Sequence, residues 1–445
     1  MLWKHLLAIP LTLSFALGGS NIQFSQDYLA SLSDKDLIAQ RLVLRADSKP
    51  QDVYHRVWRL IKDDYYEPSY NGQDWSRWEH RYDGKLKSTE DSHKAVETML
   101  ASLGDRYTRF LDRDAFDDEK SQIDAKLCGI GVQIGISRDT KRVVVITPIE
   151  DTPAARAGVL ASDEILEING RSTKGCSVED AAKMIRGPVN TPVHLTLARA
   201  GKKFKFDIVR AEIAIKAVPT AKEIDPEVGY IRLSSFISQQ ATNEMRTALN
   251  KLDKSKGIIL DLRDNPGGLL TNAIDISNMF LDSGNIVSTV DREGYKTPAQ
   301  SDGHPICRKP LVVLINKGSA SASEITSGAL QDNGRAKLVG QRSFGKGLVQ
   351  GINRLEDGSG VNITIARYLT PSDTDIHKKG IAPDVSVEVP LEENDSSKGC
   401  WFNDRPKEGA PKRTPEDGKD IQLKAAVEVI HKNIQEAEHI AIQPH

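Results

Sequence analysis

A serine, a lysine and a glutamine occur in a pattern that can support nucleophilic chemistry. Ser321 lies among small residues, in NKGSASASE (316–324), between a buried-type strand at 311–315 and a helix-type segment from about 321 to 331. A serine at a helix start can act as a nucleophile, with open backbone N–H groups beside it to bind an anion. Ser321 and Glu324 also fit the S-x-x-E capping box, in which both side chains only satisfy helical amides. This stretch leaves both interpretations open, and it does not choose among its three serines.

A serine nucleophile needs a base, and the candidate here is a lysine. No well-placed histidine follows Ser321, whereas SFGKGLVQ (343–350) places Lys346 between two glycines. Lysine becomes a base only if burial disfavours its charge, and lowering its pKa from about 10.4 to about 7 costs roughly 4–5 kcal/mol. Gln350 lies four residues further on, on the same face of a strand or helix, where its amide could orient the amine. The commoner fate of a lysine is a solvated surface position.

Composition narrows the classes of function. The chain has 445 residues, is 39% hydrophobic and 27% charged, and carries a net charge of -2. This is typical of a soluble protein of two to four domains, and it offers nothing to attract nucleic acid. The cysteines have no C-x-x-C spacing and no H-E-x-x-H motif occurs, so we expect no metal site.

The first twenty residues differ from the rest. A positively charged start is followed by a nearly continuous apolar run at 6–17 and by small residues at 16–20. This layout is typical of a secretory signal peptide (1–20) and is too short for a comfortable membrane span. An uncleaved anchor is the alternative. No other stretch could span a bilayer, so we expect an exported, soluble protein.

The periodicity of the apolar residues divides the chain after its first twenty residues into structural units. We expect a mixed α+β, multidomain chain in which strands and helices alternate in the third region, as in an α/β layer structure. Helices are expected at 27–46 and from Gln51 onward, with a break at Asn71-Gly72. The acidic segment 112–124 is interpreted as a connection between domains. The expected units are a helical N-terminal domain (27–125), a small β-rich domain (126–212), an α/β domain (213–391), and a linker with a C-terminal helix (392–445).

The segment 126–212 resembles a PDZ domain. Its short strands and two helices have the order and length of that module, and Gly129, Ile130, Gly131 and Val132 stand where the family has its carboxylate-binding loop. A helix at 178–186 would form the other wall of the groove. Such a groove binds a peptide tail as an added strand, with the terminal carboxylate in a nest of N–H groups. A Gly-rich hairpin without a ligand is the alternative.

The wider chain resembles the carboxyl-terminal processing (tail-specific) proteases, which use a Ser-Lys dyad. The family's nucleophile motif matches Ser321, its lysine follows 25 residues later at Lys346, and its glutamine matches Gln350. The segments LGDRYTRFL (103–111), DLRDNPGG (261–268), YLTP (368–371) and GIAPD (380–384) resemble further family motifs. Arg106 replaces the family's proline, and Asp373 stands where a glycine is usual. The resemblance covers about residues 50 to 390.

The resemblance implies a crotonase-like catalytic domain and roles for further residues. An oxyanion would bind the N–H of Gly267 or Gly268 and that of Ala322. Arg186, at the end of the PDZ helix, would help couple that domain to the active site. Substrates would be proteins with a free C-terminal tail, and no metal or other cofactor would be needed.

The sequence alone does not determine the substrate of the protein or its cellular location. The match is most similar to the cyanobacterial and chloroplast branch, whose members trim the photosystem II reaction-centre precursor in the thylakoid lumen. A general tail-specific protease of the periplasm is the alternative. A catalytically silent PDZ scaffold that binds tails, and a crotonase-like enzyme acting on acyl-CoA thioesters, are competing hypotheses. The sequence does not indicate an oligomeric state.

Overall fold

The computed structural model describes residues 49–124, 126–137, 140–149, 152–199, 201–214, 216–388 and 420–442. The expected signal segment, the helix expected at 27–46 and the 392–419 linker lie outside the described residues. No helix in the described part of the chain is long and apolar enough to cross a membrane.

A six-stranded sheet forms the centre of the third region. Its order is β10-β11-β12-β15-β16-β19, and every pair is parallel except β10 with β11. The strands are β10 (Thr220–Asp225), β11 (Val228–Arg232), β12 (Gly257–Asp261), β15 (Leu311–Ile315), β16 (Lys337–Gly340) and β19 (Val385–Ser386). Every residue of β12 and β15 is buried, as expected for continuous apolar strands covered on both faces.

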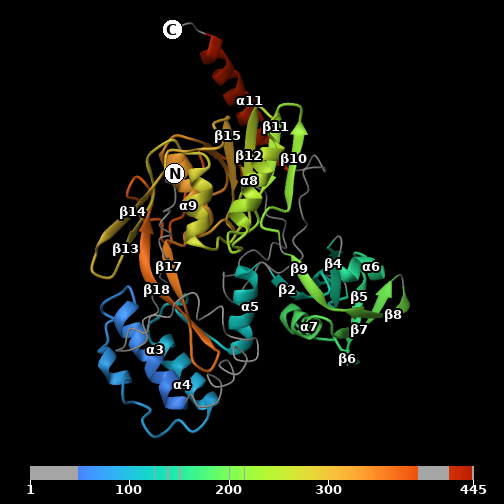
Figure 1. The fold of residues 1–445 in the computed structure, drawn as a ribbon, viewed down its shortest axis with the longest axis vertical. Coiled ribbons are helices and arrows are strands. Elements are labelled where there is room, and N and C mark those ends of the chain that lie inside the picture. The colour runs from blue at the N-terminus through green and yellow to red at the C-terminus, as the bar shows by residue number, and fades with distance from the viewer. Residues whose placement is uncertain are drawn as a thin grey trace, which may run out of the picture.

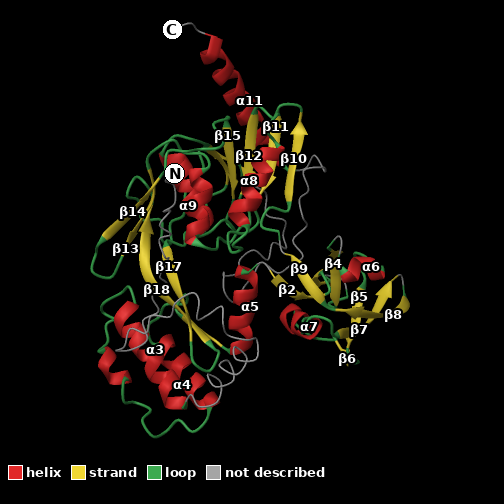
Figure 2. Cartoon of the chain, in the orientation of Figure 1, coloured by secondary structure: helices red, strands yellow, loops and turns green. Residues whose placement is uncertain are grey.

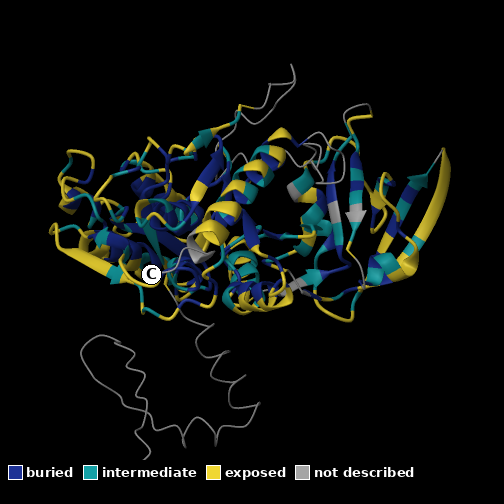
Figure 3. Cartoon of the chain, turned by 90° about the horizontal axis from the view of Figure 1, so that it is seen from above, coloured by how far each residue is buried: buried dark blue, intermediate teal, exposed yellow. Residues whose placement is uncertain are grey.

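Helices cover both faces of this sheet (Figures 1 and 2). One apolar cluster joins it to α8 (Ala241–Lys251), α9 (Leu270–Asn278) and α10 (Ala322–Asp332). A second cluster, on the opposite face, includes α11 (Ile421–Ile442). In Figure 3 the strands are mostly dark blue and the outer faces of the helices yellow, so the core lies between these layers.

A second sheet joins the N-terminal region to this α/β unit. Its order is β1-β18-β13-β14, with β17 paired to β18. The strands are β1 (Arg109–Leu111), β13 (Asn285–Val290), β14 (Lys296–Gln300), β17 (Leu348–Arg354) and β18 (Gly360–Leu369). Helices α3 (Pro50–Asp64) and α4 (Thr89–Ala101) pack on it through a cluster that includes Val361 and Ile363 of β18. The N-terminal helices therefore share a core with late residues of the chain.

Two expectations for the N-terminal region were wrong. The segment 112–124 is not a connection but contains the helix α5 (Arg113–Ile123), capped by Asp112, whose carboxylate accepts from the Ala115 amide at 2.8 Å. Only Phe116 of this helix is fully buried, so its sequence carries little apolar periodicity. The first helix ends at Asp64 rather than at Asn71, and turns with a 3-10 helix at Trp75–Trp78 follow it.

The module after α5 has the predicted strands and helices. Its sheet runs β3 (Val132–Ile136), β4 (Val143–Pro148), β5 (Glu164–Ile168), β7 (Pro192–Arg199) and β8 (Lys202–Val209), with β6 (Arg171–Ser172) beside β5. The helices are α6 (Pro153–Ala157) and α7 (Val178–Ile185). The pair β2 (Lys126–Gly129) and β9 (Ala211–Ala214) brings its two ends together where the module joins the rest of the chain (Figure 1).

The C-terminal helix is anchored by buried charges. Asp261, fully buried at the end of β12, accepts from the Arg263 guanidinium at 2.7 Å, and Arg263 also donates to Asp420 at 2.8 Å. Asp420 caps α11 by accepting from the Leu423 amide at 2.9 Å. Burial raises the pKa of Asp261, but the charge and hydrogen bonds of Arg263 outweigh it, so the pKa lies below its ordinary value. The ionised network ties α11 to the sheet.

Replacing Ile430 by alanine should destabilise the catalytic unit by about 2–5 kcal/mol, because a fully buried side chain leaves a cavity. Ile430 is 0% exposed, and a β-carbon on Gly257 of β12 would lie 2.8 Å from its Cγ1. Denaturant unfolding measures the change. Lys432→Ala is the control, because that lysine side chain is 76% exposed on the same helix. Equal unfolding midpoints for the two variants would contradict this packing.

Candidate active site

The loops that follow β12 and β15 meet at one edge of the central sheet, because the carboxyl ends of parallel strands share an edge. The Ser319 hydroxyl donates to the Leu262 carbonyl at 2.7 Å, and the Ser323 hydroxyl donates to the Asn265 carbonyl at 2.9 Å. Asn316 donates to the Asp264 carboxylate at 2.9 Å. The serine-rich turn is thus held against the loop 262–268.

The structure distinguishes between the three serines of this turn, which their spacing in the sequence could not do. Ser319 and Ser323 are fully buried, and each hydroxyl is used in holding the neighbouring loop. Ser321 is partly exposed and has φ 54° and ψ -116°. A non-glycine residue with positive φ costs on the order of 1–3 kcal/mol, and such residues cluster at functional sites. Of the three, Ser321 is therefore the candidate nucleophile that the geometry favours.

The carboxylate of Glu324 joins Ser321 to Lys346. Its Oε2 accepts from the Ser321 amide at 2.9 Å and from the Lys346 amide at 2.8 Å. Its Oε1 accepts from the Ser343 hydroxyl at 2.5 Å and from the Gly345 amide at 2.7 Å. Burial raises the pKa of Glu324, and these hydrogen bonds oppose the rise without cancelling it. Glu324 lies in the first turn of α10, as the capping motif indicates. It also binds the loop that carries Lys346, for which the sequence carried no signal.

Lys346 is buried rather than solvated. Its side chain packs with Nζ 5.0 Å from the centre of the Tyr107 ring, and only 7% of the residue is exposed. Burial and, to a smaller extent, the positive charge of Arg109 together lower the pKa of Lys346 to about 8, although the carboxylates of Asp105, Glu119 and Glu324 act in the opposite direction. A substantial neutral fraction is therefore present near neutral pH, as a lysine base requires.

Gln350 lies near the lysine but contacts a different group. It sits in β17, where a register shift places it opposite Thr364 of β18, and its amide lies 3.5 Å from the Thr364 hydroxyl. That hydroxyl donates to Asp105 at 2.6 Å. Gln350 is thus part of a chain of polar contacts that ends at Asp105, whose charge acts on Lys346. The expected contact in which Gln350 orients the Lys346 amine stays a prediction.

Backbone amides next to Ser321 form a candidate anion site. A β-carbon on Gly267, whose φ is 93°, would lie 2.8 Å from the Ala322 nitrogen, so glycine is needed for this close approach. The Gly267 amide already donates to the Asn265 side chain at 2.9 Å. The amides of Gly268 and Ala322 have no hydrogen-bond partner among the described residues. Of the two glycines left open by the sequence, the geometry favours Gly268 as the donor.

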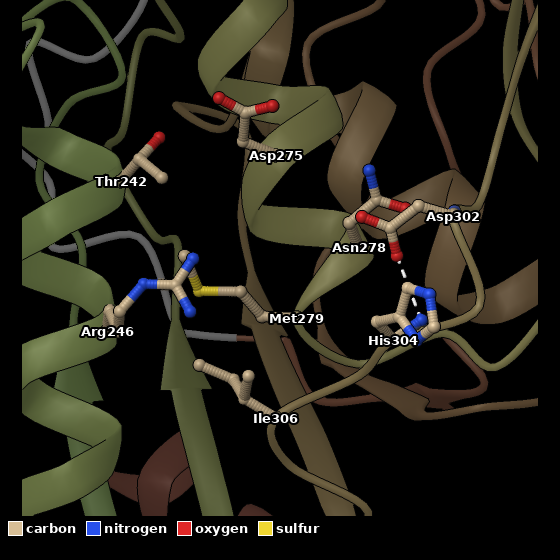
Figure 4. Close-up of a pocket in the computed structure, with 8 residues that line it drawn as sticks. All are labelled: Thr242, Arg246, Asp275, Asn278, Met279, Asp302, His304 and Ile306. Atoms are coloured by element: carbon tan, nitrogen blue, oxygen red, sulfur yellow. Dashed lines mark hydrogen bonds between the residues drawn. The ribbon is translucent and has the colours of Figure 1, made fainter. Parts of the chain in front are cut away.

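A pocket of about 280 Å³ lies elsewhere on the catalytic unit (Figure 4). It is lined by side chains of α8, α9 and the loop 302–306, with Arg246 on one side and Asp302 and His304 on the other. None of the predicted catalytic residues lines it, so it does not replace the serine–lysine pair as the candidate site.

The predicted peptide groove lies between β3 and α7. Ile130 is buried, and the Gly131 carbonyl accepts from the Ile149 amide at 2.9 Å. The amides of Ile130 and Gly131 have no partner in the described part of the chain, so they are the candidate donors to a carboxylate. Gly129 ends β2, and Val132 starts the groove strand.

Arg186 lies at the junction of the module with α5, not in the groove. Its guanidinium donates to Asp118 of α5 at 2.6 Å. The pair bridges the module and the helix that also carries Glu119, one of the carboxylates acting on Lys346. The coupling role that the resemblance implies for Arg186 stays a prediction, and its contact with α5 is consistent with that role.

Three family models match consecutive parts of the chain. Peptidase family S41 matches residues 227–387, the PDZ domain matches 120–198, and the Tricorn protease C1 domain matches 47–100. The first match contains Ser321, Lys346 and Gln350, and the second contains the predicted groove. The resemblance to PDZ domains inferred from the sequence is confirmed.

Curated relatives extend the match over most of the chain. The chain is 40% identical over 354 residues to a carboxyl-terminal-processing protease of Synechocystis, covering 78% of this chain and 83% of the relative. It is 38% identical over 356 residues to the chloroplastic carboxyl-terminal-processing peptidase 3 of Arabidopsis thaliana, covering 74% and 67%.

A solved structure has the same arrangement of elements. It is titled a photosystem II D1 C-terminal processing protease, has a TM-score of 0.53 and 33% sequence identity, and covers 77% of this chain and 94% of the neighbour. With the relatives above, this match supports a serine-type peptidase that acts on proteins. The chain belongs to the carboxyl-terminal-processing proteases of peptidase family S41.

Proposed function

We propose that this protein is an endopeptidase that cleaves near protein C-termini with Ser321 as nucleophile and Lys346 as base. The observation that carries the proposal is the joint attachment of both residues to Glu324. One carboxylate oxygen accepts from both backbone amides, which keeps a partly exposed, strained serine beside a buried lysine of lowered pKa.

The reaction proceeds in two halves. Neutral Lys346 takes the hydroxyl proton of Ser321 as its oxygen attacks the scissile carbonyl. The tetrahedral oxyanion accepts from the amides of Gly268 and Ala322; losing one such donor typically costs about 10²–10³ in rate. The ammonium of Lys346 then gives its proton to the leaving amine, and water hydrolyses the acyl-enzyme with Lys346 again acting as base. Gln350 acts through the Thr364–Asp105 chain that faces the lysine.

We also propose that the PDZ domain selects the substrate by its tail. The free amides of Ile130 and Gly131 would bind the terminal carboxylate, and the tail would extend the sheet along β3. Export fits the charged and apolar segments within 1–20. The structural neighbour named for D1 processing and the cyanobacterial relative favour a photosystem II precursor as substrate, with a general periplasmic tail-specific protease as the alternative.

Ser321→Ala and Lys346→Ala should each reduce cleavage of a tailed protein by at least about 10³-fold, since the nucleophile and its base act as one unit. Mass spectrometry of the products measures the rate, and circular dichroism checks the fold. Lys317→Ala is the matched control, because Lys317 is an exposed lysine in the same motif. Near-normal cleavage by either dyad variant would refute the assignment.

The rate should follow the ionisation of Lys346. The amine is active when neutral, so kcat/KM should rise with pH up to about 8 and level off above it. Arg109→Gln removes a charge that lowers this pKa and should shift the profile to higher pH. Glu119→Gln removes a charge that raises it and should shift the profile to lower pH.

A pH–rate series on the two variants measures both shifts. Arg109 and Glu119 form one ion pair at 2.9 Å, so a nonspecific disturbance of the pair would move both profiles in the same direction. Arg113→Gln, in an exposed i,i+4 pair with Asp117 on α5, should leave the profile unchanged. Shifts of the same sign for the two variants would contradict the electrostatic account.

Tail recognition should depend on the carboxylate loop. Amidating the C-terminus of a tail peptide should weaken its binding to the Ser321→Ala protein at least about tenfold, measured by fluorescence anisotropy. Gly131→Ala should do the same, because its φ is 78° and a β-carbon would lie 2.3 Å from the Thr152 side chain. Gly158→Ala is the control: it has φ 85° but open space around it. Equal affinities for both peptides would exclude carboxylate recognition.

A further inference from the structure

Two histidines and an aspartate converge on the surface of the N-terminal helical region, away from the dyad. His55 lies on α3, and His80 and Asp83 lie in the turn segment that follows the 3-10 helix. One ligand atom from each residue lies within 4.8 Å of the others. The dispersed histidines of the sequence gave no sign of this group, because 25 residues separate His55 from His80.

The Asp83 carboxylate has one imidazole nitrogen within 3.3 Å of each of its oxygens, a spacing comparable to that between ligand atoms around a metal ion. His55 Nε2 lies 3.3 Å from Asp83 Oδ1, and His80 Nδ1 lies 2.9 Å from Asp83 Oδ2. Tetrahedral zinc with ligands at about 2.0–2.1 Å separates its ligand atoms by about 3.4 Å. The two imidazole rings are nearly perpendicular, with an interplanar angle of 83°, so their nitrogens approach the shared carboxylate from different directions.

A carbonyl oxygen and a side-chain amide lie beside the same atoms. The Glu79 carbonyl lies 3.1 Å from His55 Nε2. The side-chain amide of Gln51 lies 3.1 Å from His55 Nε2 and 3.0 Å from Asp83 Oδ1. The oxygen and nitrogen of such an amide are interchangeable by a flip, which would present an oxygen ligand. Imidazole with carboxylate suits Zn²⁺, Ni²⁺ and Cu²⁺ rather than the oxygen-preferring Ca²⁺ and Mg²⁺.

We propose that His55, His80 and Asp83 bind a divalent transition-metal ion that fastens the turn segment 65–88 to α3. The side chains are 35%, 74% and 49% exposed, so an ion can enter from solvent. The bound ion would add a cross-link between two segments that are already joined by apolar packing and by polar contacts, such as the Tyr54 hydroxyl donating to the Trp78 carbonyl at 2.5 Å. The site is structural and does not depend on the proposed catalytic mechanism.

The test uses the full chain without a histidine tag, freed of metal by chelator and titrated with Zn²⁺ in a calorimeter. We expect one site that His80→Ala weakens at least about tenfold, together with a zinc-dependent rise in melting temperature that the variant loses, because an ion bound only to the folded state stabilises it. His80 is the most exposed ligand, so this variant should still fold.

His194→Ala supplies the matched control. His194 pairs with Asp207 at 2.6 Å on the surface of the PDZ domain, and it is absent from the three-ligand cluster. It should bind zinc like the unaltered protein. Equal zinc affinity for His80→Ala and the unaltered protein would overturn the proposal, as would zinc binding that disappears when the cysteines are alkylated.

Discussion

The buried carboxylate of Glu324 is the interaction on which the active site depends. It satisfies amides from two loops that are adjacent only in the folded chain, one carrying Ser321 and the other carrying Lys346. A buried carboxylate is costly unless hydrogen bonds replace its lost hydration, and four donors do so here. The same bonds that make the burial tolerable also fix the relative position of the two loops.

The lysine illustrates how the surrounding fold changes the chemistry of one side chain. Residues from β1, α5 and the loop before β1 surround Lys346, and their charges act on it with opposite signs. Burial is the largest effect, and it comes from packing against Tyr107 and the segments around it. The N-terminal region therefore helps to set the pKa of Lys346, although it lies more than 200 residues away in the chain.

Helix α5 connects the PDZ domain with the region around Lys346. Its Asp118 binds Arg186 at the end of the PDZ helix, and the adjacent Glu119 binds Arg109 and Asn362 near the lysine. The acidic sequence of 112–124 resembled a connection because an exposed helix with one fully buried residue needs almost no apolar periodicity.

The sequence by itself determined the local elements and the reacting groups. Apolar runs at 257–261 and 311–315 predicted buried strands, and the serine, lysine and glutamine stood at recognisable separations. Tertiary structure alone decided which serine is exposed, which glycine amide is unpaired, and that Gln350 faces Thr364. These outcomes depend on contacts between distant segments, and no periodicity within one segment records such contacts. The pKa of the lysine belongs with them, since its burial and the charges around it arise only when those segments pack together.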